Sequence, residues 1–178
     1  MSRRSTGFPA ADAADDFLRA RRRHVVTRMG QTLRRAPADA RAALSFDAVV
    51  GPLGRVSEHY AGLQTIPLDA VVGSVDKSGE YDRQFRPRSN RARDRWQRIA
   101  AARRRGEAVP PIDVYRVGQL YFVQDGHHRV SVARALGQPT IDAYVTDVRT
   151  RAPAPQLARR GELLRQARER VRRLRGAR

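Results

Sequence analysis

The chain has 178 residues, a length typical of one domain with extensions, and its 36 Lys and Arg residues against 18 Asp and Glu give a formal charge of +18. No apolar run approaches the length of a membrane-spanning helix and no apolar signal-peptide core follows the first basic residues, so we expect neither an integral membrane protein nor a secreted one. The absence of cysteine excludes disulfides, thiolate metal sites and a cysteine nucleophile, and it is compatible with the cytoplasmic location that we expect.

The positive charge is concentrated at the two ends of the chain. Residues 1–50 carry a net charge of +5, residues 51–148 carry +4, and residues 149–178 carry +9. Such an excess favours polyanionic partners, namely nucleic acid, nucleotides or an anionic membrane surface. Because Lys77 is the only lysine, the arginine-rich composition of a GC-rich genome is an alternative source of part of this charge.

We expect residues 1–62 to form a basic, helical N-terminal extension. A helix is predicted over residues 12–35, with three aspartates near its start, where negative charge suits the helix dipole. Pro37 is expected to end this helix.

The pattern changes to short β-prone runs in residues 63–148, which we take as the compact domain. A strand is predicted over residues 66–72, followed by a charged loop over residues 73–88. Ser89 is a suitable N-cap for a basic helix that runs to about residue 105, where the next glycine ends it.

The second half of this domain starts with a predicted hairpin. Its strands cover residues 112–117 and 120–124, and Gly118 lies in the turn between them. A glycine turn, a short helix and a final strand over residues 139–145 follow. This order of elements predicts a compact α+β fold.

The turn after the hairpin carries the residues best suited to bind an anion. Gly126 allows a sharp turn from strand to helix, and the first amides of the helix attract negative charge. Arg129 can bind a phosphate with two hydrogen bonds, and His127 and His128 can donate further ones. Asp125 is expected to cap the helix and fix the loop.

The two adjacent histidines allow other interpretations. They lack the spacing and the further ligands of a metal site, so we predict no metal site. One of them could act as a general acid or base near neutral pH. A structural role, with one ring packed beneath the loop and hydrogen-bonded, is the remaining alternative.

Residues 149–178 form an arginine-rich C-terminal tail. After a short proline linker, leucines recur at helical spacing and arginines occupy the other faces, which predicts an amphipathic helix. This helix could follow a phosphate backbone, lie on an anionic membrane, pack on a partner helix, or cap the core as a solvated helix. The residues that we assign to nucleic acid are Arg159, Arg160, Arg165, Arg168, Arg172 and Arg173 of the tail, with Arg103 and Arg104 of the preceding basic helix.

The stretch from Ile66 to Val148 resembles the ParB/sulfiredoxin-like domain. The segments that carry the resemblance are Ile66–Asp69, Gln84–Pro87, Pro111–Val114 and Asp125–Gly137. The resemblance implies a compact ParB/sulfiredoxin-like fold of α+β class with helical N- and C-terminal extensions.

In partition-type ParB proteins the loop that matches Gly126–Arg129 holds the triphosphate of a cytidine nucleotide, and here histidines replace its Glu and first Arg. Arg86, in the arginine-bearing loop, joins the expected phosphate site. Sulfiredoxins use a cysteine in this loop, so their activity is excluded. Other relatives transfer phosphoryl groups with the help of a carboxylate, for which the candidates here are Glu80, Asp82 and Asp125.

Thirty residues follow Val148, so we expect neither the helix-turn-helix domain nor the dimerisation domain that partition-type ParB proteins carry. The leading hypothesis is a ParB-like DNA-binding regulatory or accessory protein that binds a nucleoside triphosphate, CTP or ATP with Mg²⁺, at residues 125–129. A homodimer is compatible with this hypothesis. The alternatives are a nucleotide-dependent phosphotransferase or hydrolase that uses the same loop, and a protein-interaction module.

Overall fold

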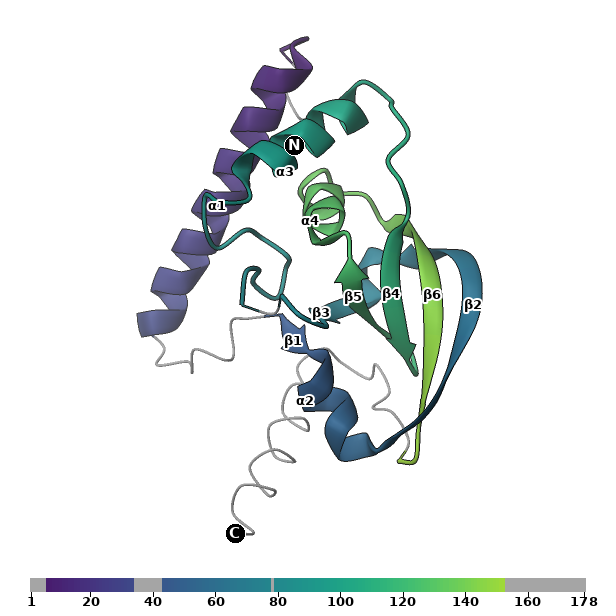
Figure 1. Cartoon of the computed structure of the whole chain (residues 1–178). Helices are drawn as coiled ribbons and strands as arrows, with labels where there is room; N and C mark the ends of the chain where they lie inside the picture. Colours follow the sequence, from purple (N-terminus) through teal and green to yellow (C-terminus); the bar gives the residue numbers. More distant parts are fainter. Residues whose placement is uncertain (1–5, 34–42, 78, 153–178) are drawn as a thin grey trace.

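A six-stranded mixed sheet forms the centre of the computed structural model, which describes residues 6–33, 43–77 and 79–152 (Figure 1). The strands are β1 (Leu44–Ser45), β2 (Arg55–Pro67), β3 (Val71–Ser74), β4 (Ile112–Val117), β5 (Leu120–Asp125) and β6 (Thr140–Thr150). The helices are α1 (Pro9–Leu33), α2 (Phe46–Val50), α3 (Arg93–Arg104) and α4 (His127–Ala135), with 3₁₀ turns η2 (Gly51–Leu53) and η3 (Leu68–Ala70). The predicted α+β fold is therefore confirmed.

The strands are ordered β1-β3-β5-β4-β6-β2, which places β5 and β4 in the middle of the sheet. β4 and β5 form the predicted antiparallel hairpin, and Gly118 takes the left-handed conformation in its turn with φ 61°. β4 also pairs in parallel with β6, while β5 pairs in parallel with β3. No helix in the described ranges is long and apolar enough to cross a membrane.

The sheet extends further in both directions than the sequence predicted. The expected domain start at residue 63 falls inside β2, whose antiparallel pairing with β6 runs from Arg55 opposite Thr150 to Pro67 opposite Thr140. β1 also belongs to the sheet, because it pairs in parallel with β3. Most side chains of β2 are exposed, so the strand lacks the alternation of apolar and polar residues by which a half-buried strand is predicted.

Apolar side chains pack on both faces of the sheet. On one face, Val123 of β5 packs with Val130 and Ala133 of α4. On the other face, Phe46 of α2 packs against Phe122, with the ring centroids 5.5 Å apart. Helices therefore pack on both faces of the sheet, α4 on one face and the short α2 on the other.

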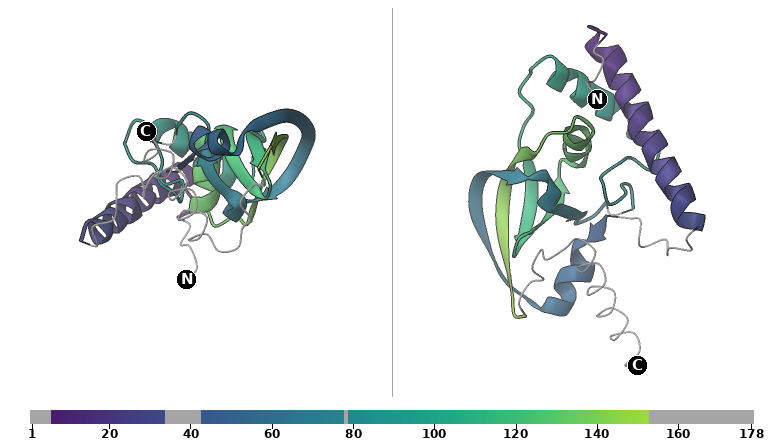
Figure 2. Two further views of the ribbon diagram at one scale, coloured as in Figure 1. Left: turned by 90° about the horizontal axis from the view of Figure 1, so that it is seen from below. Right: turned by 180° about the vertical axis from the view of Figure 1, so that it is seen from behind.

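The N-terminal helix is an integral part of the fold. α1 runs along α3 (Figures 1 and 2), and Phe17 of α1 meets Trp96 of α3 edge to face at 5.5 Å between ring centroids. The indole Nε1 of Trp96 donates to Ser131 Oγ of α4 at 2.8 Å. Trp96 thus connects α1, α3 and α4 in one small core with Val132.

The basic helix starts later than the sequence predicted. α3 begins at Arg93 with Ala92 at the N-cap position, so Ser89 is not its cap. The preceding residues form a turn, because the Asn90 carbonyl accepts the N–H of Arg93 at 2.9 Å. The end of the helix agrees with the prediction, since Gly106 follows it with φ 77°. The predicted end of the first helix at Pro37 lies outside the described residues.

Gly73 of β3 leaves no room for a side chain. A Cβ at this position would lie 2.6 Å from Cδ1 of Phe122 and closer still to the Leu44 carbonyl oxygen. We predict that Gly73→Ala lowers the free energy of unfolding by about 1–3 kcal/mol, because neither neighbour has room to move. Gly51→Ala is the control, since no atom lies within 4 Å of the added carbon. Urea denaturation measures both variants, and equal stability would show that the sheet is not packed as described.

Candidate functional site

The predicted turn from strand to helix is present between β5 and α4. Gly126 is the N-cap of α4 and has φ 96°, a conformation that favours glycine. A Cβ here would lie 2.9 Å from Arg129 Nε and would overlap Cγ2 of Ile112. The position therefore requires glycine both for its backbone conformation and for lack of space.

His127, the first residue of α4, is buried. Its Nε2 lies 2.7 Å from Ser74 Oγ at the end of β3. The ring also stacks on Tyr81, with 5.8 Å between centroids. Burial, with a smaller contribution from the positive charge of Lys77, lowers the pKa of His127 from 6.5 to about 4. The imidazole is consequently neutral near physiological pH and acts as a structural link between β3 and α4.

His128 is half-buried and lies at the edge of the same ring cluster. Its Nδ1 is 2.7 Å from the hydroxyl of Tyr81. Burial lowers the pKa of His128, and the nearby charges of Arg95 and Lys77 lower it further. The pKa of Tyr81 is raised by burial and by the charge of Glu80, so the phenol keeps its proton.

Arg129 and Asp125 are arranged differently from the sequence prediction. Asp125 does not cap α4, because α4 has no side-chain cap and the Asp125 carboxylate instead accepts from Arg129 Nη2 at 2.6 Å. Arg129 Nη1 donates to the carbonyl of Pro110 at 3.0 Å and to that of Pro111. In this arrangement the guanidinium fastens the segment before β4 to α4.

Two further predicted site residues, Asp82 and Arg86, organise the loop between β3 and α3. Oδ1 of Asp82 accepts the backbone N–H groups of Gln84 and Arg86, both at 2.9 Å. Oδ2 accepts Arg86 Nε at 2.7 Å and lies 3.0 Å from His24 Nδ1 of α1. Arg86 also donates to Thr27 Oγ1 of α1 at 3.1 Å. Both side chains are therefore engaged in hydrogen bonds within the fold.

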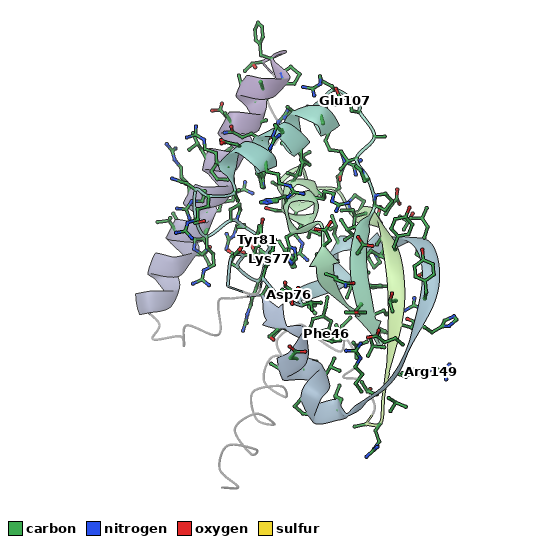
Figure 3. The ribbon with its side chains drawn as sticks, viewed as in Figure 1. Phe46, Asp76, Lys77, Tyr81, Glu107 and Arg149 are labelled. Atoms are coloured by element: carbon green, nitrogen blue, oxygen red, sulfur yellow. The ribbon has the colours of Figure 1, made fainter. Side chains whose placement is uncertain are left out.

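Lys77 and Arg95 were not among the predicted site residues, yet the charges of both act on His128 at the start of α4. The backbone N–H of Lys77 donates to Ser74 Oγ at 2.8 Å, and Ser74 in turn contacts His127. Figure 3 shows Lys77 and Tyr81 in the loop between β3 and α3, beside α4. Both cations are exposed, and both lower the pKa of His128. The one available signal was that Lys77 is the only lysine among 36 basic residues.

Among the three carboxylates considered for catalysis, only Glu80 is both exposed and without an ion pair among the described residues. It lies near the histidine cluster, because its charge raises the pKa of His128. Asp82 is buried with both oxygens engaged, and Asp125 is paired with Arg129. Within the described ranges, no group of three or more His, Asp or Glu side chains could hold a metal ion.

The arginines assigned to nucleic acid fall into three groups. Arg104 is paired with Asp16 at 2.6 Å and Asp12 at 3.4 Å, so it fastens α1 to α3 and is not available to a phosphate backbone. Arg103 lies half-buried in the last turn of α3. The tail residues lie outside the described part of the chain; they are Arg159, Arg160, Arg165, Arg168, Arg172 and Arg173.

Comparison with known proteins identifies the family. The family model of the ParB N-terminal domain matches residues 59–156, more than half of the chain. The chain belongs to the ParB N-terminal domain family. The matched region of this ParB-type chain begins in β2 and includes β3, the histidine loop and β6, whereas α1 lies outside it.

The other comparisons add little about activity. Three chains of solved structures match, among them sulfiredoxin from Arabidopsis thaliana, with 21% identity, a TM-score of 0.36, and 59% of this chain and 94% of that chain covered. A search of curated proteins finds no significant match.

The buried His127 generates a pH prediction. Its pKa is about 4 in the folded chain against 6.5 in the unfolded one, so the unfolded chain binds the proton more readily. We expect the free energy of unfolding to be highest above pH 6.5 and to fall by about 3 kcal/mol on this account as the pH drops to 4. Urea denaturation between pH 7 and pH 4 measures the change.

His127→Gln should lack this part of the pH dependence, whereas the control His59→Gln, at an exposed position of β2, should keep it. A nuclear magnetic resonance titration of the wild-type ring gives an independent measurement. A His127 midpoint near 6.5 would contradict the prediction.

Proposed function

We propose that this ParB-family protein binds DNA and holds the phosphates of a nucleotide at the start of α4, and that it acts as a DNA-associated regulatory or accessory factor. The observation that carries the nucleotide site is the position of Lys77, whose backbone N–H donates to Ser74 Oγ beside His127 at the start of the glycine-initiated helix α4. Arg95 of α3 adds a charge that lowers the pKa of His128. Three different segments supply these groups, namely the loop after β3, α3 and the start of α4.

The chemistry of this cluster suits a phosphate group. Gly126 lets a ligand approach the backbone, and the start of α4 contributes the positive end of the helix dipole. Lys77 and Arg95 supply full positive charges. Because the pKa of Tyr81 is raised and that of His128 is lowered, the phenol can donate to Nδ1 of the neutral ring, which leaves an Nε2–H to donate to a phosphate oxygen.

The nucleotide in this proposal is a nucleoside triphosphate, CTP or ATP with Mg²⁺. The resemblance to partition-type ParB proteins favours CTP, while the histidines in the loop distinguish this site from theirs. Arg129 acts as a positioning residue here, since its hydrogen bonds to the Pro110 and Pro111 carbonyls hold the loop in place.

A phosphotransferase or hydrolase remains the second candidate because of Glu80. This carboxylate is exposed and near His128, so it could accept a proton from a hydroxyl or a water that attacks the terminal phosphorus. Phosphate release with ATP or CTP distinguishes this function from binding alone. A protein-interaction module, the third hypothesis, predicts no affinity for nucleotide or DNA.

The nucleotide site is tested by Lys77→Gln. Removal of one charge-assisted hydrogen bond to phosphate should weaken nucleotide binding by about 10- to 100-fold and reduce the thermal stabilisation by CTP or ATP with Mg²⁺ accordingly. Arg149→Gln is the matched control, because it removes the same charge from β6, far from Lys77 (Figure 3). Isothermal titration calorimetry measures both variants. Equal affinities for the two variants would contradict the site, and no stabilisation of the wild type would contradict nucleotide binding as a whole.

The DNA-binding role of the tail is tested by ending the chain after Ala152. This deletion removes nine arginines and two glutamates and keeps every strand of the sheet. We predict weaker binding to duplex DNA and a shallower salt dependence, with the log–log slope reduced by about 0.9 for each phosphate that the shortened chain no longer neutralises. Fluorescence anisotropy between about 50 and 200 mM salt measures the slope. An unchanged slope would show that the tail does not bind DNA.

A further inference from the structure

We infer that Arg91, Arg95 and Arg98 form a phosphate-binding track for duplex DNA on the outer side of α3, separate from the C-terminal tail. This inference rests on the proposed DNA-binding function and names a surface for it within the folded part of the chain. We call these three residues the α3 track.

The arginines on and near α3 are of two kinds: some are hydrogen-bonded within the protein, and others are exposed without such bonds among the described residues. Arg86, Arg104, Arg129 and Arg134 are held by carboxylates or by backbone carbonyls of the protein. The three arginines of the α3 track are exposed and make no hydrogen bond or ion pair with the described residues. An exposed guanidinium without such a hydrogen bond or ion pair can bind a phosphate.

The spacing of the α3 track matches one side of a helix. Arg95 and Arg98 are three residues apart on α3, and Arg91 lies four residues before Arg95 in the turn that leads into the helix. Side chains three residues apart on a helix, such as Arg95 and Arg98, are neighbours with about 5–6 Å between Cβ atoms. Trp96 and Ala100 are buried on the opposite side, so packing fixes the direction in which the track faces.

The charge of this surface is little compensated. Between residues 91 and 98, Asp94 is the only acidic side chain. Arg105, the next arginine on this side, is paired with Glu107 and is therefore not included in the track. Three exposed arginines beside a single carboxylate leave an excess of positive charge, which suits a duplex whose phosphates are regularly spaced.

The α3 track also lies beside the proposed nucleotide site. The charge of Arg95 lowers the pKa of His128, which places this guanidinium near the start of α4. Arg91 and Arg98 are not among the main causes of the pKa shifts of His127 and His128. A variant that changes Arg91 and Arg98 but keeps Arg95 therefore tests the track without removing a cation from the nucleotide site.

The test compares the full-length wild type with two double variants. Arg91→Gln with Arg98→Gln removes two charges from the track. Arg149→Gln with Arg151→Gln removes two exposed charges, one near the end of β6 and one just after it. Figure 3 shows Arg149 far from α3. All four positions are exposed, and thermal unfolding verifies that both variants keep the wild-type stability. Binding to a duplex of about 20 base pairs is measured by anisotropy over a range of salt concentrations.

We expect the log–log salt slope of the Arg91 and Arg98 variant to fall by about 1.8, since two phosphates of the duplex are no longer neutralised. The Arg149 and Arg151 variant should keep a slope close to that of the wild type. If the wild type binds duplex DNA but the first variant keeps its slope, or the slopes of both variants fall by the same amount, the α3 track is wrong while the proposed function stands. If the wild type binds no duplex DNA at low salt, DNA binding itself is wrong.

Discussion

A buried carboxylate, Asp82, is the constraint on which the candidate site depends. It stands in a long loop between β3 and α3 and engages both of its oxygens, accepting backbone N–H groups from the loop itself, the guanidinium of Arg86, and a contact from His24 of α1. A buried charge is tolerated only when it is paired and hydrogen-bonded in this way. Because the same loop carries Lys77 and Tyr81, the conformation that Asp82 imposes determines which groups face the start of α4.

Arg134 of α4 also contacts this loop, which carries Phe85, and the segment just before it. Its Nη2 donates to the carbonyls of Leu68 and Val71 at 2.6 Å each, and its guanidinium lies 5.1 Å from the ring centroid of Phe85. The contacts of Asp82 with His24 and of Arg86 with Thr27 join this region to the N-terminal helix α1. Many of the arginines in this strongly basic chain hold the structure together, and only the remainder are free to meet an anion.

The local elements could be predicted because their signals lie in neighbouring residues. The hairpin around Gly118 and the glycine turn at Gly126 are both present, since each depends on a backbone conformation that glycine adopts readily. β1 and residues 55–65 of β2 were missed, because both depend on pairing with strands distant in the sequence. The contacts of Arg129 within the fold could not be predicted for a similar reason, since its partners Pro110 and Pro111 are almost twenty residues away.

The sequence by itself determined the α+β class, the resemblance to the ParB family and the loop that begins α4, because these depend on composition and on short motifs. It could not separate structural cations from available ones, since arginines look alike in a sequence. Only the tertiary structure decided that Arg86, Arg104 and Arg129 are bound within the fold while Lys77 and Arg95 stand at the start of α4. The physical reason is that a guanidinium takes the nearest carboxylate or carbonyl that packing places within reach, and packing is set by contacts between segments distant in the chain.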